Sequence, residues 1–506
     1  MKVLQELFPH VNLLNVLQHM EDDCTPKYLK RIRQLFQRLR DASETNETEM
    51  VRLLYGDSRT SSHPPFQELL TKTSVAAIKA FVLPSARHTS SPSRRAMIQR
   101  CERAYALLYM TSERSTETRI KLWRQLVKSA RQCHHIPLEL ECLQVLQAIY
   151  GYRSFDETLL EDTETKIRRC FDENSAITRC KMAAMDLRIA STEGTPYPRN
   201  IPAEEIISAI RQYDLYDIQY YGGEMLTQLS IHQQDWREAL NYSGGALTFF
   251  RENFPKERQP LVHFLYNQVL IFTALLDFSQ GWSRWKDLLR LCKRGKTSSA
   301  TQLGKVIEVG IVLALRCGNA KTTSKLLLAI EDGGGVKLIP EREYGRWLTY
   351  LRSLALLNND RPDVLEMIAT QERRIQREGK KIVFRREDEQ IMAIIECLQL
   401  LRGQSFRKAA VIVTTLRDSL PKRLSPDHPE YRLQLFLRLL VESGYANFHR
   451  AATLRKTSKI LKRLRTTGPG ITDDGIDTEL IVYEHLWEIL LLTLTEKAPR
   501  LPYLAN

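Results

Sequence analysis

Polar interruptions recur at a regular interval through the second half of this 506-residue chain, and this repeat restricts the possible folds more than any other feature. They divide a sequence with helical patterning into successive pairs of segments, at intervals of 38 to 46 residues. The interruptions are Gln234-Asp235, Gln280-Gly281, Gly318-Asn319, Asn359-Asp360, Gln404-Ser405 and Tyr445-Ala446. A period of this length is typical of arrays of helix hairpins, in which each hairpin buries its apolar face only by packing against its neighbours.

Apolar residues recur at steps of three and four in nearly every window of the chain, and no long stretch alternates at period two. Clusters of Val, Ile and Thr between turn residues, which are typical of strands, are nearly absent. The sequence therefore predicts an all-α protein, built as an array of antiparallel helix hairpins.

Length and composition suggest how the array is divided. A single core rarely exceeds about 300 residues, so a chain of this length needs several domains or an elongated repeat. We predict an N-terminal helical cap over 1–95 with a mobile Ser-, Pro- and Arg-rich loop at 84–95, helical hairpins over 96–200 and helical repeats over 201–506. The segment 191–201, which contains one glycine and two prolines, is either a domain joint or a long loop within a continuous array.

One repeat carries a more specific pattern. A polar residue and Asp precede Trp236, after which Ala239, Tyr242 and Ala246 follow at helical spacing, and Leu226 stands in the preceding helix. This pattern resembles the turn and second helix of a tetratricopeptide repeat, in which small alanines let two helices approach and aromatic residues fill the gaps. The repeat departs from the family at Thr227, Ser230 and Pro255, and its intervals exceed the family's usual length of about 34 residues.

This resemblance implies a TPR-like α-solenoid that binds a protein or peptide on a concave surface. The chain is also similar to helical-repeat proteins of Bacteroidetes-type bacteria. We therefore expect a non-catalytic protein-protein interaction scaffold with an acidic partner and no small-molecule substrate.

The chain is basic, with 74 Lys and Arg against 60 Asp and Glu and a net charge of +14. Such a balance favours acidic proteins, nucleic acids or anionic membrane surfaces as partners. Two basic segments consist of Lys27, Lys30, Arg31, Arg33, Arg38 and Arg40, and of Arg373, Arg374, Arg377, Lys380, Lys381, Arg385 and Arg386. The third segment contains the candidate anion-binding residues Arg455, Lys456, Lys459, Lys462 and Arg463, followed by Arg465.

The third basic segment has two interpretations. It is either the solvated face of an amphipathic helix or an anion-binding strip. The second interpretation leads to the alternative function of a nucleic-acid-associated regulatory factor. The sequence contains no helix-turn-helix, zinc-finger or RNA-binding motif to accompany it.

No pattern in the sequence indicates catalysis, a cofactor or a metal. Gly295-Lys296-Thr297-Ser298 resembles the end of a phosphate-binding loop, but position 290 is Arg where that loop needs Gly. The adjacent His134 and His135 would point about 100° apart on a helix, so they do not form a metal pair. We therefore expect no enzyme activity and no catalytic, cofactor-binding or metal-binding residues.

Nine cysteines without a C-x-x-C spacing argue against a disulfide framework and indicate a reducing compartment. The N-terminal residues lack the apolar core of a secretory signal. The longest uncharged run, Gln259–Leu276, contains polar residues and predicts a buried helix rather than a transmembrane segment. These features predict a cytoplasmic protein.

Overall fold

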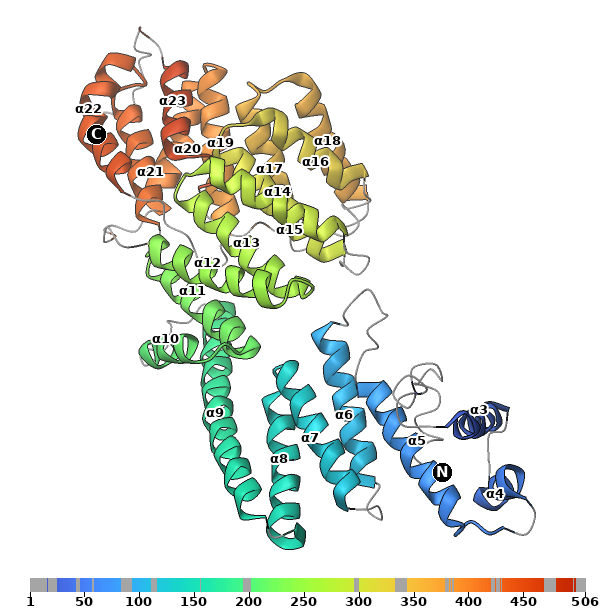
Figure 1. Ribbon diagram of the computed structural model, residues 1–506. Helices are drawn as coiled ribbons and strands as arrows, with labels where there is room; N and C mark the ends of the chain where they lie inside the picture. Colours follow the sequence, from blue (N-terminus) through green and yellow to red (C-terminus); the bar gives the residue numbers. More distant parts are fainter. Residues whose placement is uncertain are drawn as a thin grey trace. The chain divides into compact units, whose positions relative to one another are not determined.

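A computed structural model places most of the chain in helices (Figure 1). It describes residues 16, 25–41, 46–56, 59–82, 93–110, 116–154, 156–193, 202–294, 300–332, 344–377, 382, 384, 386–419, 424, 428, 430–467, 479–494 and 496. No β-strand occurs within these ranges, which confirms the all-α prediction. The predicted loop at 84–95 lies outside them except for its last residues, where a helix already begins at Arg94.

The helices group into two units. Unit 1 comprises Met1–Met182 and Glu204–Tyr221, and unit 2 comprises Ala183–Ala203 and Gly222–Asn506. The long helix α9, Glu157–Glu193, contributes to both units. The division into segments 1–95, 96–200 and 201–506 stays a prediction.

Unit 1 is a succession of helices around one buried cluster that includes Phe66, Trp123 and Tyr150. Besides part of α9, it contains α3 Pro26–Asp41, α4 Glu47–Tyr55, α5 Pro64–Val82, α6 Arg94–Met110, α7 Thr116–Gln132, α8 Ile136–Ile149, the π-helices η2 Tyr150–Ser154 and η3 Ile218–Gly222, and α10 Ala203–Gln212. Arg94 stabilises the end of α7, because its guanidinium donates to the carbonyls of Cys133 at 2.8 Å and His134 at 3.1 Å.

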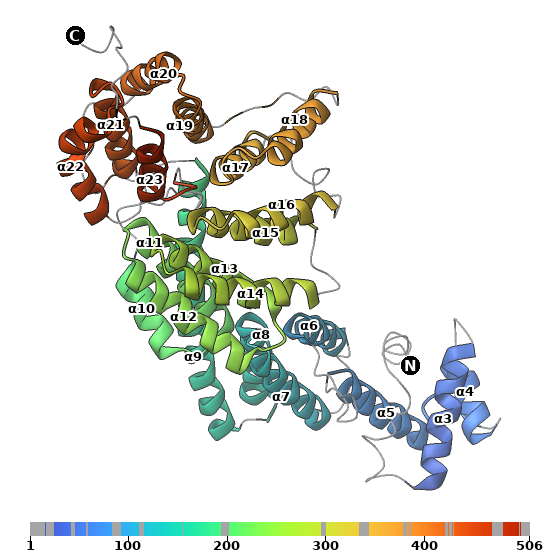
Figure 2. The same ribbon diagram turned by 90° about the horizontal axis from the view of Figure 1, so that it is seen from above.

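Besides the end of α9, the described residues of unit 2 form six helix hairpins and a final helix, and the hairpins follow one another as neighbouring pairs in Figure 2. Its helices are α11 Gly223–His232, α12 Trp236–Asn253, α13 Arg258–Ala274, α14 Phe278–Arg294, α15 Ala300–Arg316, α16 Ala320–Asp332, α17 Tyr344–Leu357, α18 Pro362–Arg377, α19 Arg386–Arg402, α20 Phe406–Ser419, α21 Tyr431–Tyr445, α22 Arg450–Thr466 and α23 Tyr483–Thr493. We call the odd-numbered helices α11 to α21 the first helices and the even-numbered helices α12 to α22 the second helices.

The same turn joins the two helices of every hairpin in unit 2. The chain enters the left-handed region at the end of the first helix, and the next amide donates to the carbonyl five residues earlier. The donors and acceptors are Asp235 to Ser230, Asp277 to Phe272, Asn319 to Ala314, Asp360 to Ala355, Ser405 to Leu400 and Phe448 to Ser443, all at 2.8–3.0 Å. This bond is the 6→1 contact that closes a helix C-terminus, and here it recurs at intervals of 41 to 45 residues.

The residue after the left-handed position also begins the second helix in several of these turns. The Asp235 carboxylate accepts from the amide of Glu238 at 3.0 Å, and Asp277 and Asn319 make the equivalent contacts three residues ahead. The interruption predicted at Gln280-Gly281 is wrong, because both residues lie within α14 and the turn is at Leu276-Asp277. Leu276 adopts φ 59°, in the left-handed region, which apolar residues rarely adopt. The sequence therefore gives no indication of a turn at this position.

Buried polar contacts join the first helices of neighbouring hairpins. The Tyr350 hydroxyl on α17 donates to Glu308 on α15 at 2.8 Å, and Arg346 on α17 donates to Asp388 on α19 at 2.8 Å. Each pair is 42 residues apart in sequence, the length of one repeat. A contact that recurs at the repeat length fixes how one hairpin lies against the next.

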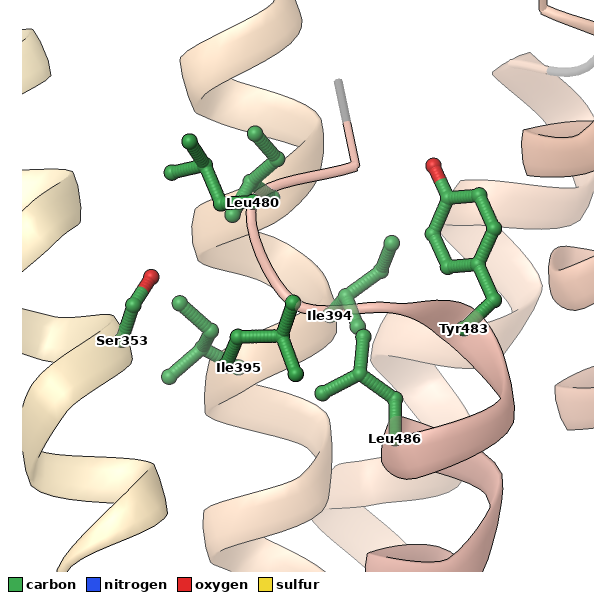
Figure 3. A pocket seen from close by; sticks show the side chains of 8 residues that line it. Ser353, Ile394, Ile395, Leu480, Tyr483 and Leu486 are labelled. Carbon is green, nitrogen blue, oxygen red and sulfur yellow. The ribbon is translucent and has the colours of Figure 1, made fainter. Parts of the chain in front are cut away.

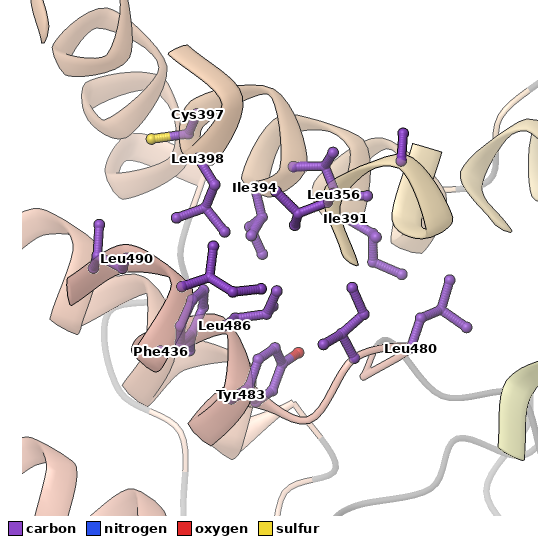
Figure 4. Packing of buried hydrophobic residues seen from close by; sticks show 14 of the residues in the cluster. Leu356, Ile391, Ile394, Cys397, Leu398, Phe436, Leu480, Tyr483, Leu486 and Leu490 are labelled. Carbon is purple, nitrogen blue, oxygen red and sulfur yellow. The ribbon is translucent and has the colours of Figure 1, made fainter. Parts of the chain in front are cut away.

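Residues 479–494 pack against the first helices of four hairpins, and Figure 4 shows their packing with α17, α19 and α21. The Glu479 carbonyl accepts from Arg316 at the end of α15, and Leu480 and Leu486 lie against α17 and α19. On α21, the ring of Phe436 stacks on Tyr483 of α23 with centroids 5.0 Å apart. Residues 479–494 therefore cover part of the surface formed by the first helices.

Candidate functional site

The structure places the tetratricopeptide-like residues in the first hairpin of unit 2. Leu226 on α11 and Ala239 and Ala246 on α12 are buried, whereas Trp236 and Tyr242 are half-buried. The two helices approach closely at Gly223, where an added Cβ would lie 3.0 Å from the Cβ of Ala246. The small residues therefore lie at the helix contact, and the two aromatic side chains keep part of their surface in solvent.

Helix α22 carries the candidate anion-binding residues and is held firmly on the body of unit 2. Thr453, Thr457 and Leu464 are buried, and all three lie on the side that faces unit 2. At the start of the helix, the His449 ring accepts a hydrogen bond from the amide of Ala452 at 3.3 Å. This fixed backbone presents most of the remaining side chains of α22 to solvent, while Ile460 and Leu461 pack partly on the core.

Arg432 holds the other end of α22. Its guanidinium, almost fully buried on α21, donates to the carbonyls of Leu464 at 2.7 Å and Thr467 at 2.6 Å. The same group pairs with Glu479 at 2.8 Å and with Glu484 at 2.7 Å. One buried cation thus joins the C-terminus of α22 to the start of α23, a relationship that no local pattern in the sequence predicts.

The exposed side of α22 is predominantly cationic. The helix has seven basic residues and no acidic residue, and all seven are exposed. They are Arg450, Arg455, Lys456, Lys459, Lys462, Arg463 and Arg465, which we call the cationic face. At 100° per residue, Arg455, Lys459 and Lys462 lie opposite the buried residues Thr457 and Leu464. The residues predicted as an anion-binding strip are therefore brought together on one exposed surface.

The charges of this surface are not neutralised within the part of the chain that the structure describes. No side chain of the cationic face lies within ion-pair distance of a described carboxylate, and the only polar partner is the carbonyl of Tyr445, which accepts from Lys456 at 3.3 Å. Some cations elsewhere are paired: Arg352 contacts Glu372 at 2.7 Å, and Arg290 contacts Asp287 at 2.8 Å. A local excess of positive charge of this kind attracts anions.

The structure describes the other two basic segments only in part. On α3, the Arg31 guanidinium lies over the Tyr55 ring at 4.1 Å, while Lys30, Arg33 and Arg38 are exposed. On α18, Arg373 folds back onto the carbonyl of Ala369 at 3.1 Å. The side chains of Lys27, Arg40, Arg374 and Arg386, and residues Lys380, Lys381 and Arg385, lie outside the description.

The adjacent histidines of unit 1 have structural roles. His135 accepts from the amide of Leu138 at 3.1 Å at the start of α8, and His134 accepts from the amide of Tyr216 at 3.3 Å. Burial, reinforced by the Arg94 and Arg131 guanidinium groups, lowers the pKa of His134 to about 4. Both rings accept hydrogen bonds through Nδ1, which requires that nitrogen to be unprotonated.

The described residues contain no cluster of three or more side chains suited to hold a metal ion. A small apolar cavity of about 10 Å³ lies between α17, α19 and the segment before α23 (Figure 3), and has room for about one water molecule. The segment Gly295–Ser298 lies outside the described residues.

No helix among the described segments combines the length and the apolar character needed to cross a bilayer. Comparison of the chain with protein-family models, with curated proteins and with solved structures gives no match. The tetratricopeptide resemblance therefore remains a prediction based on the residues of one repeat.

Proposed function

We propose that this chain is a non-catalytic binding scaffold, a TPR-like α-solenoid in which successive hairpins present a surface to an acidic protein or peptide. The recurrence of one hairpin turn at intervals of 41 to 45 residues supports this proposal, because stacked hairpins form extended surfaces suited to a long partner. The net charge of +14 favours an acidic partner. A cytoplasmic location belongs to the same proposal.

We place the partner near α12. Residues 479–494 already cover first helices further along the array, so that surface is occupied by the chain itself. On α12, Trp236 and Tyr242 are half-buried and keep part of their surface in solvent, and aromatic side chains of this kind contribute strongly to protein interfaces.

The test is purification of the full chain from its native lysate after nuclease treatment, followed by reconstitution of each co-purified protein with the pure chain. A 1:1 complex whose dissociation constant rises at least tenfold in Trp236→Ala and Tyr242→Ala would support the proposal. Tyr109→Ala is the control, since Tyr109 is an exposed aromatic residue of unit 1. Failure to obtain any protein partner, or equal weakening by the control, would contradict it.

A further inference from the structure

We propose that the cationic face of α22 is a binding site for the phosphate backbone of duplex DNA. This inference is independent of the proposed protein-binding function, because it concerns a different helix and a different class of ligand. It rests on the charge, exposure and anchoring of α22.

The concentration of charge on this helix is the first argument. Seven cations and no anion occur in 17 residues, so α22 alone carries +7 in a chain whose net charge is +14. A helix selected only for solubility gains from intermixed Glu and Lys, which form favourable pairs one turn apart. On α22, Arg455 and Lys459, and Lys459 and Arg463, instead place like charges one turn apart, which destabilises the isolated helix. A polyanion bound to this surface removes that repulsion.

The anchoring of the helix is the second argument. The carbonyls of Leu464 and Thr467 are held by Arg432, and the opposite end is capped by His449. The cations therefore project from a backbone whose position is already set. Because only the side chains become ordered when a ligand binds, the entropy cost of binding is small.

The composition of the exposed surface distinguishes between classes of polyanion. Protein interfaces are enriched in aromatic residues and depleted in Lys at their centre, whereas this surface has three lysines and no aromatic residue. Single-stranded nucleic acid is bound by stacking its bases on aromatic side chains, which α22 does not offer. A membrane surface requires an apolar helix face that inserts among the lipids. Among the large apolar residues of α22, Leu464 is buried, Ile460 and Leu461 are partly buried, and Leu454 alone is exposed, so α22 offers no such face.

Duplex nucleic acid is the class of polyanion that remains. Proteins contact the backbone of duplex DNA through Arg, Lys, Ser and Thr side chains. Besides its cations, α22 exposes the hydroxyl-bearing residues Ser458 and Thr466. The helix is about 25 Å long, which corresponds to about seven base pairs. Its cations spread over about two thirds of the circumference, which suits the two phosphate rims of the B-form major groove. The deep, narrow major groove of an RNA duplex does not admit a helix in this way.

Titration of the full chain with a fluorescent 20-base-pair DNA duplex at several salt concentrations tests the proposal. If four cations each neutralise one phosphate, the affinity should fall about 150-fold between 50 and 200 mM NaCl. In the double variant Lys459→Gln and Lys462→Gln two contacts remain, and the same change in salt should lower the affinity only about 12-fold. Gln preserves helix propensity and removes like-charge pairs, so the variant should unfold at the same temperature as the natural chain or slightly above it.

The matched control is Lys286→Gln with Lys293→Gln, because both lysines are exposed on α14. Unchanged binding in this control, together with loss in the α22 variant, assigns the site to α22. The proposal is overturned if no duplex binds at 50 mM NaCl, or if both double variants weaken binding equally. Equal affinity for poly-glutamate would assign the surface to an acidic protein instead, and tighter binding of an RNA duplex would overturn the assignment to DNA.

Discussion

The hydroxyl of Tyr350 donates a hydrogen bond of 2.8 Å to Glu308, which lies 42 residues earlier in the chain. The same hydroxyl accepts a hydrogen bond from Arg346 at 3.2 Å, and Arg346 in turn pairs with Asp388, 42 residues later. These contacts connect α15, α17 and α19 through the interior of unit 2. This series of polar contacts therefore follows the sequence repeat. Its contribution to the stability of the fold can be tested by substituting Arg346, which lies in the middle of the series.

Arg346→Met should be strongly destabilising. The substitution leaves Asp388, which is fully buried, without its cation, and the loss of one partner from a buried pair costs about 3–5 kcal/mol. Urea denaturation followed by circular dichroism measures the change. Arg361→Met is the control, because the Arg361–Asp363 pair is exposed and should contribute less than about 1 kcal/mol. Similar losses in the two variants would contradict the importance of the buried pair.

Two substitutions at equivalent turns should have opposite effects. Gly318 adopts φ 66°, and an added Cβ would lie 2.6 Å from a ring carbon of His485. Gly318→Ala should therefore cost at least about 1–2 kcal/mol, because the left-handed conformation and this close contact both oppose the Cβ. Gln404 adopts φ 58° at the matching position of a later turn, so Gln404→Gly should be neutral or slightly stabilising. Thermal unfolding of the two variants beside the natural chain measures both effects, and a loss of stability at Gln404→Gly equal to that at Gly318→Ala would refute the explanation.

His134 should make the chain less stable in mild acid. Its pKa is about 4 in the folded chain, below the ordinary value of 6.5, so the unfolded chain binds a proton that the folded chain excludes. The contribution is complete above about pH 6.5 and is lost as the pH falls towards 4. His134→Asn, which tolerates the φ of 53° at this position, should lose less stability than the natural chain between pH 7 and pH 5. Urea denaturation at both pH values provides the comparison, and equal losses would exclude this role for His134.

The sequence predicts the hairpins because their causes are local. Helical periodicity marks the helices, and Gly318-Asn319 marks a turn because glycine permits the left-handed conformation and asparagine caps the next helix. The turn at Leu276-Asp277 is missed because leucine rarely adopts the left-handed conformation, and here an exposed leucine does so at a turn closed by the backbone bond from Asp277 to Phe272. The composition of α22 is readable from the sequence, but its exposure and its lack of described carboxylate partners depend on folding.

The contact between Arg432 and Glu479 could not be predicted, since the two residues are 47 positions apart in sequence. The sequence does indicate that Arg432 needs a partner. Arg432 lies near the start of the segment Tyr431–Leu440, in which most residues are apolar, and a charge among buried residues requires a partner. The sequence does not indicate which carboxylate provides it. Long-range pairing of this kind follows only from the packed structure.

Arg432→Lys should loosen α22 without removing any charge from its surface. An ammonium group has three donors on one atom, so it cannot reach the carbonyls of Leu464 and Thr467 while pairing with Glu479 and Glu484. We expect faster amide hydrogen exchange in the last turn of α22 and at the start of α23, measured by mass spectrometry. Peptides from unit 1 provide the internal control and should exchange as in the natural chain. If the end of α22 kept its protection in Arg432→Lys, the helix would be held by its apolar contacts alone, and Arg432 would have no part in positioning the cationic face.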